Sequence, residues 1–154
     1  MNRKMDAETI GLLLDGCFMA KKITETLPEL PKGMKPRQNY VLHAVYIFQK
    51  EAEGCRVSDV SKSLGTTMPS VTKLVSELSD RGLLEKYQDE DDGRVTLLRL
   101  TESGYQYVKK YVLDFHSDWA KNMQTVSALQ VAQAIEVLTK FRDAMPQMRK
   151  GGEK

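Results

Sequence analysis

Two short helical patterns separated by a glycine, and followed by two extended runs, constrain this sequence more than any other feature. Ser58 precedes the first pattern, residues 59–64, as a candidate N-cap, and Gly65 follows it as a terminator. The chain then restarts into a second pattern over residues 68–80. The segment therefore predicts two short helices joined by a tight turn.

The extended runs cover residues 83–87 and 94–100, and the second is rich in β-forming side chains. Between them lies an acidic segment that ends in Asp92-Gly93. An Asp-Gly pair supplies turn geometry between two strands, so we expect a β-hairpin with an acidic tip at this point.

Long amphipathic patterns flank this middle unit. An apolar repeat over residues 6–27 predicts a first helix, and Pro36 begins a second helix that is apolar around much of its circumference. Two further helices follow a cap-like Thr101-Glu102-Ser103-Gly104. The apolar positions of the flanking helices, at spacings of three and four, are Ile10, Leu13, Leu14, Cys17 and Phe18, then Tyr105, Val108, Val112, Phe115 and Trp119, then Val131, Ala134, Leu138, Phe141, Met145 and Met148.

Each of these seams could close on the core of its own chain. The middle unit is too small to cover all of them, however, so we expect a helical dimer interface. The predicted fold is mainly α with a small β-wing. Residues 1–35 and 101–154 are assigned to dimerisation, and residues 36–100 to a winged helix-turn-helix lobe.

Composition places the chain among soluble globular proteins, with 154 residues, 41% hydrophobic and 29% charged. No apolar stretch approaches the roughly 20 residues that span a bilayer, and no signal-peptide pattern opens the chain. A cytoplasmic location without a membrane partner is expected. Cys17 and Cys55 lie 38 positions apart without a partner motif, which favours reduced thiols.

The second short helix divides into two faces at 100° per residue. Apolar side chains gather on one face, and small, hydroxylated or basic side chains on the other. The free face suits the major groove of DNA, where hydroxyls and a lysine serve base edges or phosphates. An ordinary solvated helix face is the competing interpretation. The packed side is Val71, Leu74, Val75 and Leu78, and the free side is Pro69, Thr72, Lys73 and Ser76.

Thr67 is the expected N-cap of this helix, because Pro69 lacks an N–H and Thr67 is placed to accept from Ser70. A helix N-terminus presents unpaired amides and a partial positive charge, which suit a DNA phosphate.

Arg94 follows the hairpin turn, where a basic side chain can be held over the minor groove. Asp92 is expected to accept a hydrogen bond from its guanidinium and fix its direction, although a loose surface ion pair is the alternative. The acids at residues 89–91 are compatible with DNA only if the hairpin tip projects beyond the phosphates or orients Arg94.

Net charge is only +2, and residues 56–100 carry seven bases against eight acids. A polyanion-binding face must therefore be made by placement, and a winged-helix protein-interaction module without DNA binding stays open as an alternative. The sequence does not indicate an enzyme, because it has two histidines and no glycine loop that cradles phosphate. Neither histidine has metal-ligand spacing, so no metal or cofactor is expected.

Three segments together resemble the MarR family of bacterial regulators: residues 67–75, residues 81–84 and residues 89–104. Asp92, Arg94, Leu100, Thr101 and Gly104 match the wing pattern of that family, whereas Gly93 stands where many members have a second basic residue. The resemblance implies a homodimer bound to a pseudo-palindromic double-stranded operator, usually as a repressor. The expected DNA-binding residues are Arg37, Ser58, Thr66, Thr67, Pro69, Ser70, Thr72, Lys73, Ser76, Asp92 and Arg94.

Members of this family commonly release DNA when a small aromatic or anionic effector occupies a crevice between the dimerisation helices and the lobe. The residues that would line it here are Phe18, Tyr40, His43, Tyr111 and Phe115. Core packing is the alternative for each, and His43 is expected as a hydrogen-bonded interior histidine. Some relatives sense oxidants through a first-helix cysteine, and Cys17, with Tyr40 near it, has a similar placement.

Overall fold

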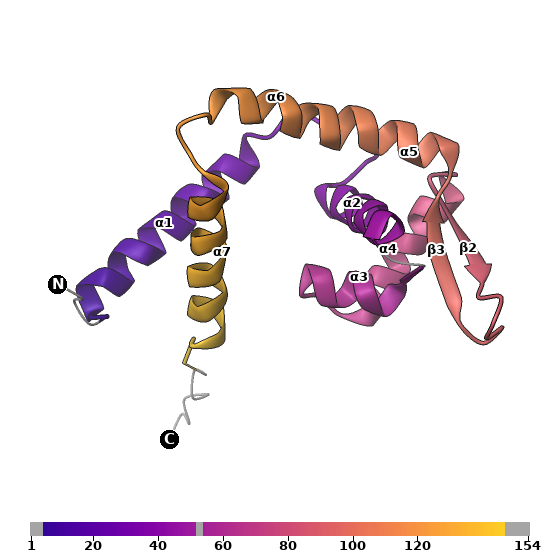
Figure 1. The fold of residues 1–154 in the computed structure, drawn as a ribbon, viewed down its shortest axis with the longest axis horizontal. Coiled ribbons are helices and arrows are strands. Elements are labelled where there is room, and N and C mark those ends of the chain that lie inside the picture. Colours follow the sequence, from indigo (N-terminus) through magenta and orange to yellow (C-terminus); the bar gives the residue numbers. More distant parts are fainter. Residues whose placement is uncertain (1–4, 52–53, 147–154) are drawn as a thin grey trace, which may run out of the picture.

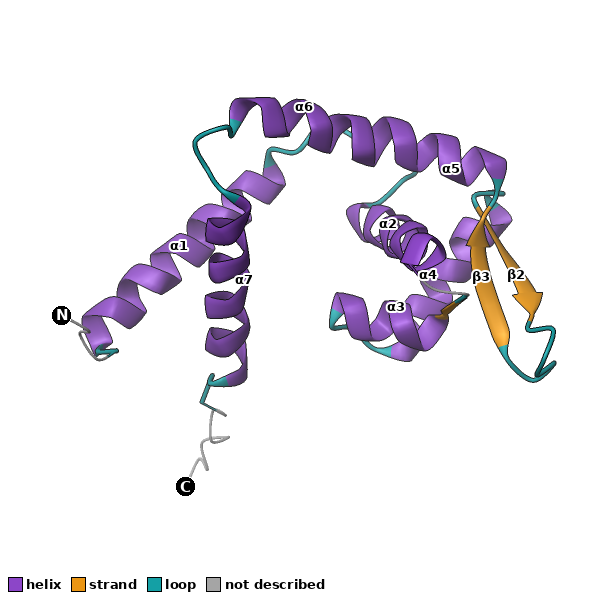
Figure 2. Ribbon diagram, viewed as in Figure 1, coloured by secondary structure: helices purple, strands orange, loops and turns teal. Residues whose placement is uncertain are grey.

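The structure is a computed structural model that describes residues 5–51 and 54–146. A winged lobe stands at one side, α1 and α7 stand at the other, and one long helical segment bridges them (Figure 1). In the colouring by secondary structure, the strands are confined to the lobe (Figure 2). The mainly helical fold with a small β-wing is thus confirmed. No helix in these residues is both long and apolar enough to cross a membrane.

The lobe contains three helices, which are α2 (Pro36–Glu51), α3 (Val57–Leu64) and α4 (Met68–Asp80). Pro36 opens α2, where its missing N–H costs nothing. Gly65 ends α3 in the left-handed conformation, with φ +58°, as the sequence predicts for a glycine after the last helical residue. α3 and α4 thereby form the expected helix-turn-helix.

The sheet has three antiparallel strands in the order β1-β3-β2, namely β1 (Cys55–Arg56), β2 (Leu84–Gln88) and β3 (Thr96–Leu100). β2 and β3 form the expected hairpin, with Leu84 opposite Leu100 and Gln88 opposite Thr96. The short strand β1 was not predicted, because two residues are too few to show a period of two.

The core lies where the lobe helices meet the sheet. α2 supplies buried side chains on several faces, as its apolar run predicts, and α4 supplies the apolar side of its wheel. The buried apolar residues of the core are Val41, Leu42, Ala44, Val45, Cys55, Val60, Val71, Val75, Leu78, Leu84, Leu98, Val108 and Val112.

The expected N-cap of α3 is wrong. Ser58 is the second residue of the helix, and Arg56 occupies the cap position with φ −94° and ψ 156°. The carboxylate of Asp59 accepts the backbone N–H of Arg56 at 2.8 Å, so an acid reaching back to the cap replaces the expected serine.

The expected Asp-Gly turn is present, because the backbone N–H of Val95 donates to Asp92 O at 2.8 Å across Gly93 and Arg94, although Gly93 is not among the described glycines with positive φ. In addition, the carboxylate of Asp89 accepts the backbone N–H groups of Asp91 and Asp92, both at 2.9 Å. The backbone N–H of Asp89 donates to Val95 O at 2.9 Å and closes the loop. Side-chain capping by an aspartate therefore shapes this tip.

Thr101 and Gly104 join the wing to the next helix. The Thr101 hydroxyl donates to Gly82 O at 2.6 Å and accepts the backbone N–H of Gly104 at 3.0 Å. A Cβ at residue 104 would lie 1.9 Å from the carbonyl oxygen of Leu83. The spacing of threonine and glycine thus lets this helix begin directly against the loop after α4.

The bridging segment consists of α5 (Glu102–Val108), a π-helical turn η1 (Lys109–Leu113) and α6 (Asp114–Asn122). The sequence predicted one regular helix here. In the π-turn the N–H of Asp114 donates to Lys109 O, five residues back. Val108 and Val112 are buried against the lobe, whereas Trp119 at the far end is 39% exposed.

α1 (Ala7–Glu25) and α7 (Ala128–Asp143) have the expected helical character, with Asp6 and Ser127 as their N-caps. Neither helix contains a buried residue within the single chain. Met148 of the predicted seam lies outside the described residues. The large exposed apolar side chains of these helices, of the end of α6 and of the α6–α7 turn are Leu12, Leu14, Phe18, Met19, Ile23, Trp119, Met123, Val126, Leu129, Val131, Ile135, Val137 and Leu138.

Candidate nucleic-acid interface and cavity

α4 presents the two faces that the sequence predicted. Val71, Val75 and Leu78 are buried, and Leu74 is partly buried. The opposite side is exposed and contains Pro69, Thr72, Lys73 and Ser76. No part of the described lobe covers this face, so it is free to meet a partner.

Hydroxyl groups line the start of this helix. Thr67 is the N-cap, as predicted, but its side chain pairs with the Ser70 hydroxyl at 2.9 Å and does not accept a backbone N–H. The Thr72 hydroxyl donates to Met68 O at 2.9 Å, which leaves its lone pairs as acceptors. The first amides of α4 therefore lack a side-chain cap, which leaves them available to an anion such as phosphate.

The wing holds Arg94 away from the rest of the chain. Asp92 Oδ1 accepts the backbone N–H of Arg94 at 3.0 Å, whereas the guanidinium Nε is 4.0 Å from the same oxygen. The expected hydrogen bond from the guanidinium is therefore wrong, and the orientation comes from the backbone. In Figure 1 the hairpin tip lies on the side of the lobe opposite to α5.

Three further predicted residues surround this surface. Arg37 is exposed in the first turn of α2, and Ser58 is half-buried in the first turn of α3. Thr66 is half-buried in the turn between α3 and α4, where its carbonyl accepts the Ser61 hydroxyl at 2.5 Å. Their contact with DNA stays a prediction.

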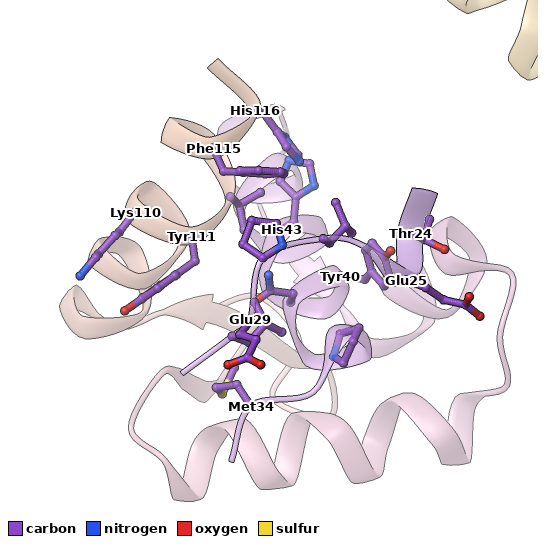
Figure 3. A pocket seen from close by; sticks show the side chains of 16 residues that line it. Thr24, Glu25, Glu29, Met34, Tyr40, His43, Lys110, Tyr111, Phe115 and His116 are labelled. Atoms are coloured by element: carbon purple, nitrogen blue, oxygen red, sulfur yellow. The ribbon is translucent and has the colours of Figure 1, made fainter. Parts of the chain in front are cut away.

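A cavity of about 710 Å³ lies between the chain segment around residues 24–43 and the bridging helices. Tyr40, His43, Tyr111 and Phe115 line it, as the sequence proposed for an effector site. Figure 3 shows Lys110, Tyr111, Phe115 and His116 together on the bridging helices, with His43 beside them and Tyr40 beyond His43. Phe18 is not among the lining residues and is 67% exposed on α1.

His43 differs from the expected interior histidine. Its ring meets the ring of His116 edge-on, with centroids 5.5 Å apart, and in residues 5–51 and 54–146 it has no hydrogen-bond partner. Burial, and secondarily the charge of His116, lower the pKa of His43. This lowered pKa favours the neutral imidazole of His43 in the cavity wall.

Sequence reasoning missed the contribution of the linker between α1 and α2. Glu29 and Met34 line the cavity from this segment, Glu25 lines it from the end of α1, and Lys110 and His116 line it from the bridging helices. The linker has no periodic pattern, so its position depends on tertiary packing. His116 could have been found, because it directly follows Phe115 on the same helix.

The two cysteines occupy different environments. Cys17 is half-buried on α1, and the oxidant-sensing alternative for it stays a prediction. Cys55 is fully buried, and burial, with a smaller effect of Asp59, raises its pKa to about 12. No cluster of metal-ligating side chains is found among the described residues.

Taken together, a helix-turn-helix, a three-stranded sheet and an extended hairpin define a winged helix-turn-helix protein. The sequence model of the MarR family matches residues 32–95. The transcriptional repressor MprA of Escherichia coli K12 is 22% identical over 134 residues, which cover 87% of this chain and 76% of MprA. The chain is thus similar to the MarR family over residues 32–95, and to a curated transcriptional repressor over most of its length.

Solved structures support the same fold. PcaV from Streptomyces coelicolor, determined with its natural ligand, superimposes with a TM-score of 0.62 at 23% identity and covers 92% of this chain and 98% of its own. MepR of S. aureus in complex with DNA gives a TM-score of 0.60 at 20% identity and covers 94% and 100%, respectively. The arrangement of the lobe and the flanking helices is thus that of known winged-helix proteins.

Proposed function

We propose that this chain is a sequence-specific double-stranded DNA-binding regulator that acts as a ligand-responsive homodimeric repressor. The observation that carries the proposal is the exposed face of α4, where Thr72, Lys73 and Ser76 stand free beside a wing whose Arg94 is held outward. A face of this chemistry suits a major groove, and the arginine suits the adjacent minor groove.

Dimerisation is supported by the apolar side chains of α1 and α7, which the single chain leaves exposed. A contiguous apolar surface of this kind on a water-soluble protein marks an association site. We assign residues 1–35 and 101–154 to this interface, and residues 36–100 to DNA. Two recognition helices related by a dyad then require half-sites about 10 base pairs apart.

The effector site in this proposal is the 710 Å³ cavity, whose volume and mixed apolar and polar lining suit a small aromatic or anionic molecule. Tyr111 and Phe115 offer ring faces, Lys110 offers positive charge, and the imidazoles of His43 and His116 offer hydrogen-bonding groups. An enzymatic role is not part of the proposal, and the proposed location is the cytoplasm.

Selection of duplexes from a random pool, followed by anisotropy titration of the selected DNA over a range of salt, tests this function. We expect a pseudo-palindromic site, bound by two chains, whose affinity falls steeply as salt rises because phosphate contacts release counterions. Failure to enrich any duplex would contradict the proposal. It would instead favour a winged-helix module that binds protein, for which salt dependence is weak.

A further inference from the structure

Polar contacts tie the end of α4, the proposed recognition helix, to the linker before α2 and to the first turn of α2. Glu77 Oε2 accepts the side-chain Nε2–H of Gln38 at 2.8 Å, and the ammonium of Lys35 lies 4.0 Å from the same oxygen. One turn further along the chain, Arg81, the C-cap residue of α4, donates from Nη2 to Gly33 O at 2.6 Å. Glu77 and Arg81, one turn apart at the end of α4, thus hold the segment of residues 33–38.

The same segment forms the rim of the cavity. Met34 and Pro36 line it, and so does Asn39, whose side-chain oxygen accepts the Tyr107 hydroxyl of α5 at 2.7 Å. Figure 3 shows Met34 at the edge of the group of lining side chains. Along the chain, these lining residues alternate with Gly33, Lys35 and Gln38, which contact Glu77 and Arg81. A molecule bound in the cavity would therefore contact the same short segment that the end of α4 holds.

Both the oxygen and the nitrogen of the Gln38 side-chain amide take part in this link. Its side-chain oxygen accepts the backbone N–H of Lys35 at 2.9 Å and so caps α2, while its amide nitrogen serves Glu77. Gln38 is only 1% exposed, so water cannot readily replace either partner. Moving the rim without moving α4 would leave a buried amide without its acceptor.

Gly33 makes the second contact equally specific. Its φ is +84°, and a Cβ on it would lie 2.8 Å from Arg81 Nη2. The guanidinium thus packs directly on the glycine backbone. α2 and α4 also share the apolar core, and apolar burial of this kind holds two helices together without fixing their direction.

We propose that Gln38, Glu77 and Arg81 are positioning residues that transmit occupation of the cavity to the recognition helix. The proposal rests on the proposed function and adds its route of regulation. α4 is a single rigid helix, so a displacement of Glu77 and Arg81 moves the DNA-facing side chains Thr72 and Ser76 on the same element.

The experiment uses a covalent occupant, because it needs no knowledge of the natural effector. In a Cys17→Ser background, Tyr40→Cys places a thiol in the cavity wall, and N-phenylmaleimide attaches an aromatic group to it; Cys55 is buried and protonated. The measured quantity is the ratio of the DNA dissociation constants after and before labelling, on the selected duplex. Complete labelling is checked by mass spectrometry and folding by thermal melting.

We expect labelling to weaken DNA binding at least about fivefold in this parent, the lower end of usual allosteric couplings. In Glu77→Ala and in Arg81→Ala the ratio should fall below about twofold. Glu77→Gln should keep most of the parent ratio, because its amide oxygen still accepts from Gln38. A general loss of stability affects the labelled and unlabelled protein alike and leaves the ratio unchanged.

Glu85→Ala is the matched control. It removes the same charge from the same lobe and breaks the pair with Arg99, at 2.6 Å, but does not contact the linker. Its ratio should equal that of the parent. The coupling route would be wrong if the parent, Glu77→Ala and Arg81→Ala gave equal ratios. It would also be wrong if the parent gave a ratio of one while still binding DNA. Neither outcome would contradict the proposed DNA-binding function. If the unlabelled parent bound no selected duplex, the proposed function would fail and the route with it.

Discussion

Asp92 accepts the backbone N–H of Arg94 at 3.0 Å, and this bond directs the wing while the arginine side chain stays 96% exposed. The guanidinium is thus presented to solvent with its donors free. Asp92 orients Arg94 through the backbone N–H. This bond does not have to break when the guanidinium contacts an anion. The acidic tip is folded by Asp89 instead, so the two tasks of the loop are separate.

Arg94→Ala should weaken binding of the selected duplex at least about tenfold, the usual cost of losing one groove-reading arginine. The dimer should stay intact, because the hairpin of β2 and β3 lies on the opposite side of the molecule from α1 and α7 (Figure 1). Anisotropy titration and sedimentation measure the two quantities. Arg99→Ala is the control, since its guanidinium is held by Glu85 within the sheet. Equal losses in the two variants would remove the specific role of the wing tip.

Lys73→Ala should reduce both the DNA affinity and its salt dependence, because Lys73 is exposed on the free face of α4. If each Lys73 neutralises one phosphate, the log–log salt slope should fall by about one unit per contact. Lys140→Ala, on α7 and paired with Glu136, should leave the slope unchanged. A wild-type slope in Lys73→Ala would place this lysine on a base edge or in solvent.

Ile135→Asp should shift the protein toward monomers, because Ile135 is 59% exposed on α7 of the single chain and belongs to the proposed interface. A carboxylate buried between two chains would lose its hydration without gaining a partner. Sedimentation equilibrium measures the association, and DNA affinity should fall with it. Gln133→Asp, a polar position on the same helix, is the control. A fully dimeric Ile135→Asp protein would place the interface elsewhere.

Elements with a periodic apolar pattern, or with a residue that ends such a pattern, could be predicted from the sequence. The faces of α4 followed from the spacing of its apolar residues, and the end of α3 from Gly65. Contacts between residues distant in the chain were not predictable. Nothing local indicates that Gln38 would meet Glu77, 39 positions away, or that Arg81 would rest on Gly33. Pairing of this kind depends on packing that periodicity does not describe.

The local errors have local causes. Serine is a frequent N-cap, but the carboxylate of Asp59 already satisfies the N–H of Arg56, so α3 begins two residues earlier than Ser58 predicts. At the hairpin tip the Asp92-Gly93 turn forms as expected, but the side-chain cap that Asp89 places on two backbone amides has no counterpart in the sequence pattern. In both places an acidic side chain makes local hydrogen bonds that the pattern does not indicate.

Gly104→Ala should destabilise the fold by about 1–3 kcal/mol, the usual cost of forcing extra volume into a packed site. The added Cβ would meet the carbonyl oxygen of Leu83 at 1.9 Å, and backbone cannot rotate away as a side chain can. Denaturant unfolding measures the change. Gly93→Ala is the control, because nothing lies within 4 Å of its Cβ position. Similar stabilities for both variants would show that the wing–α5 junction adapts freely.

Acid should destabilise the protein partly through His43. Burial, and then the charge of His116, lower its pKa in the folded chain, so below the ordinary value of about 6.5 the unfolded chain binds more protons than the folded one. The contribution of His43 to stability is therefore complete above that pH and is lost as the pH falls through it toward the lowered pKa. His43→Gln should flatten the fall in melting temperature over this range. His116→Gln should remove only the smaller contribution to the lowered pKa of His43, and so should flatten the fall less. A His43→Gln profile parallel to that of the wild type would show that the cavity is hydrated enough to accept the charged imidazole.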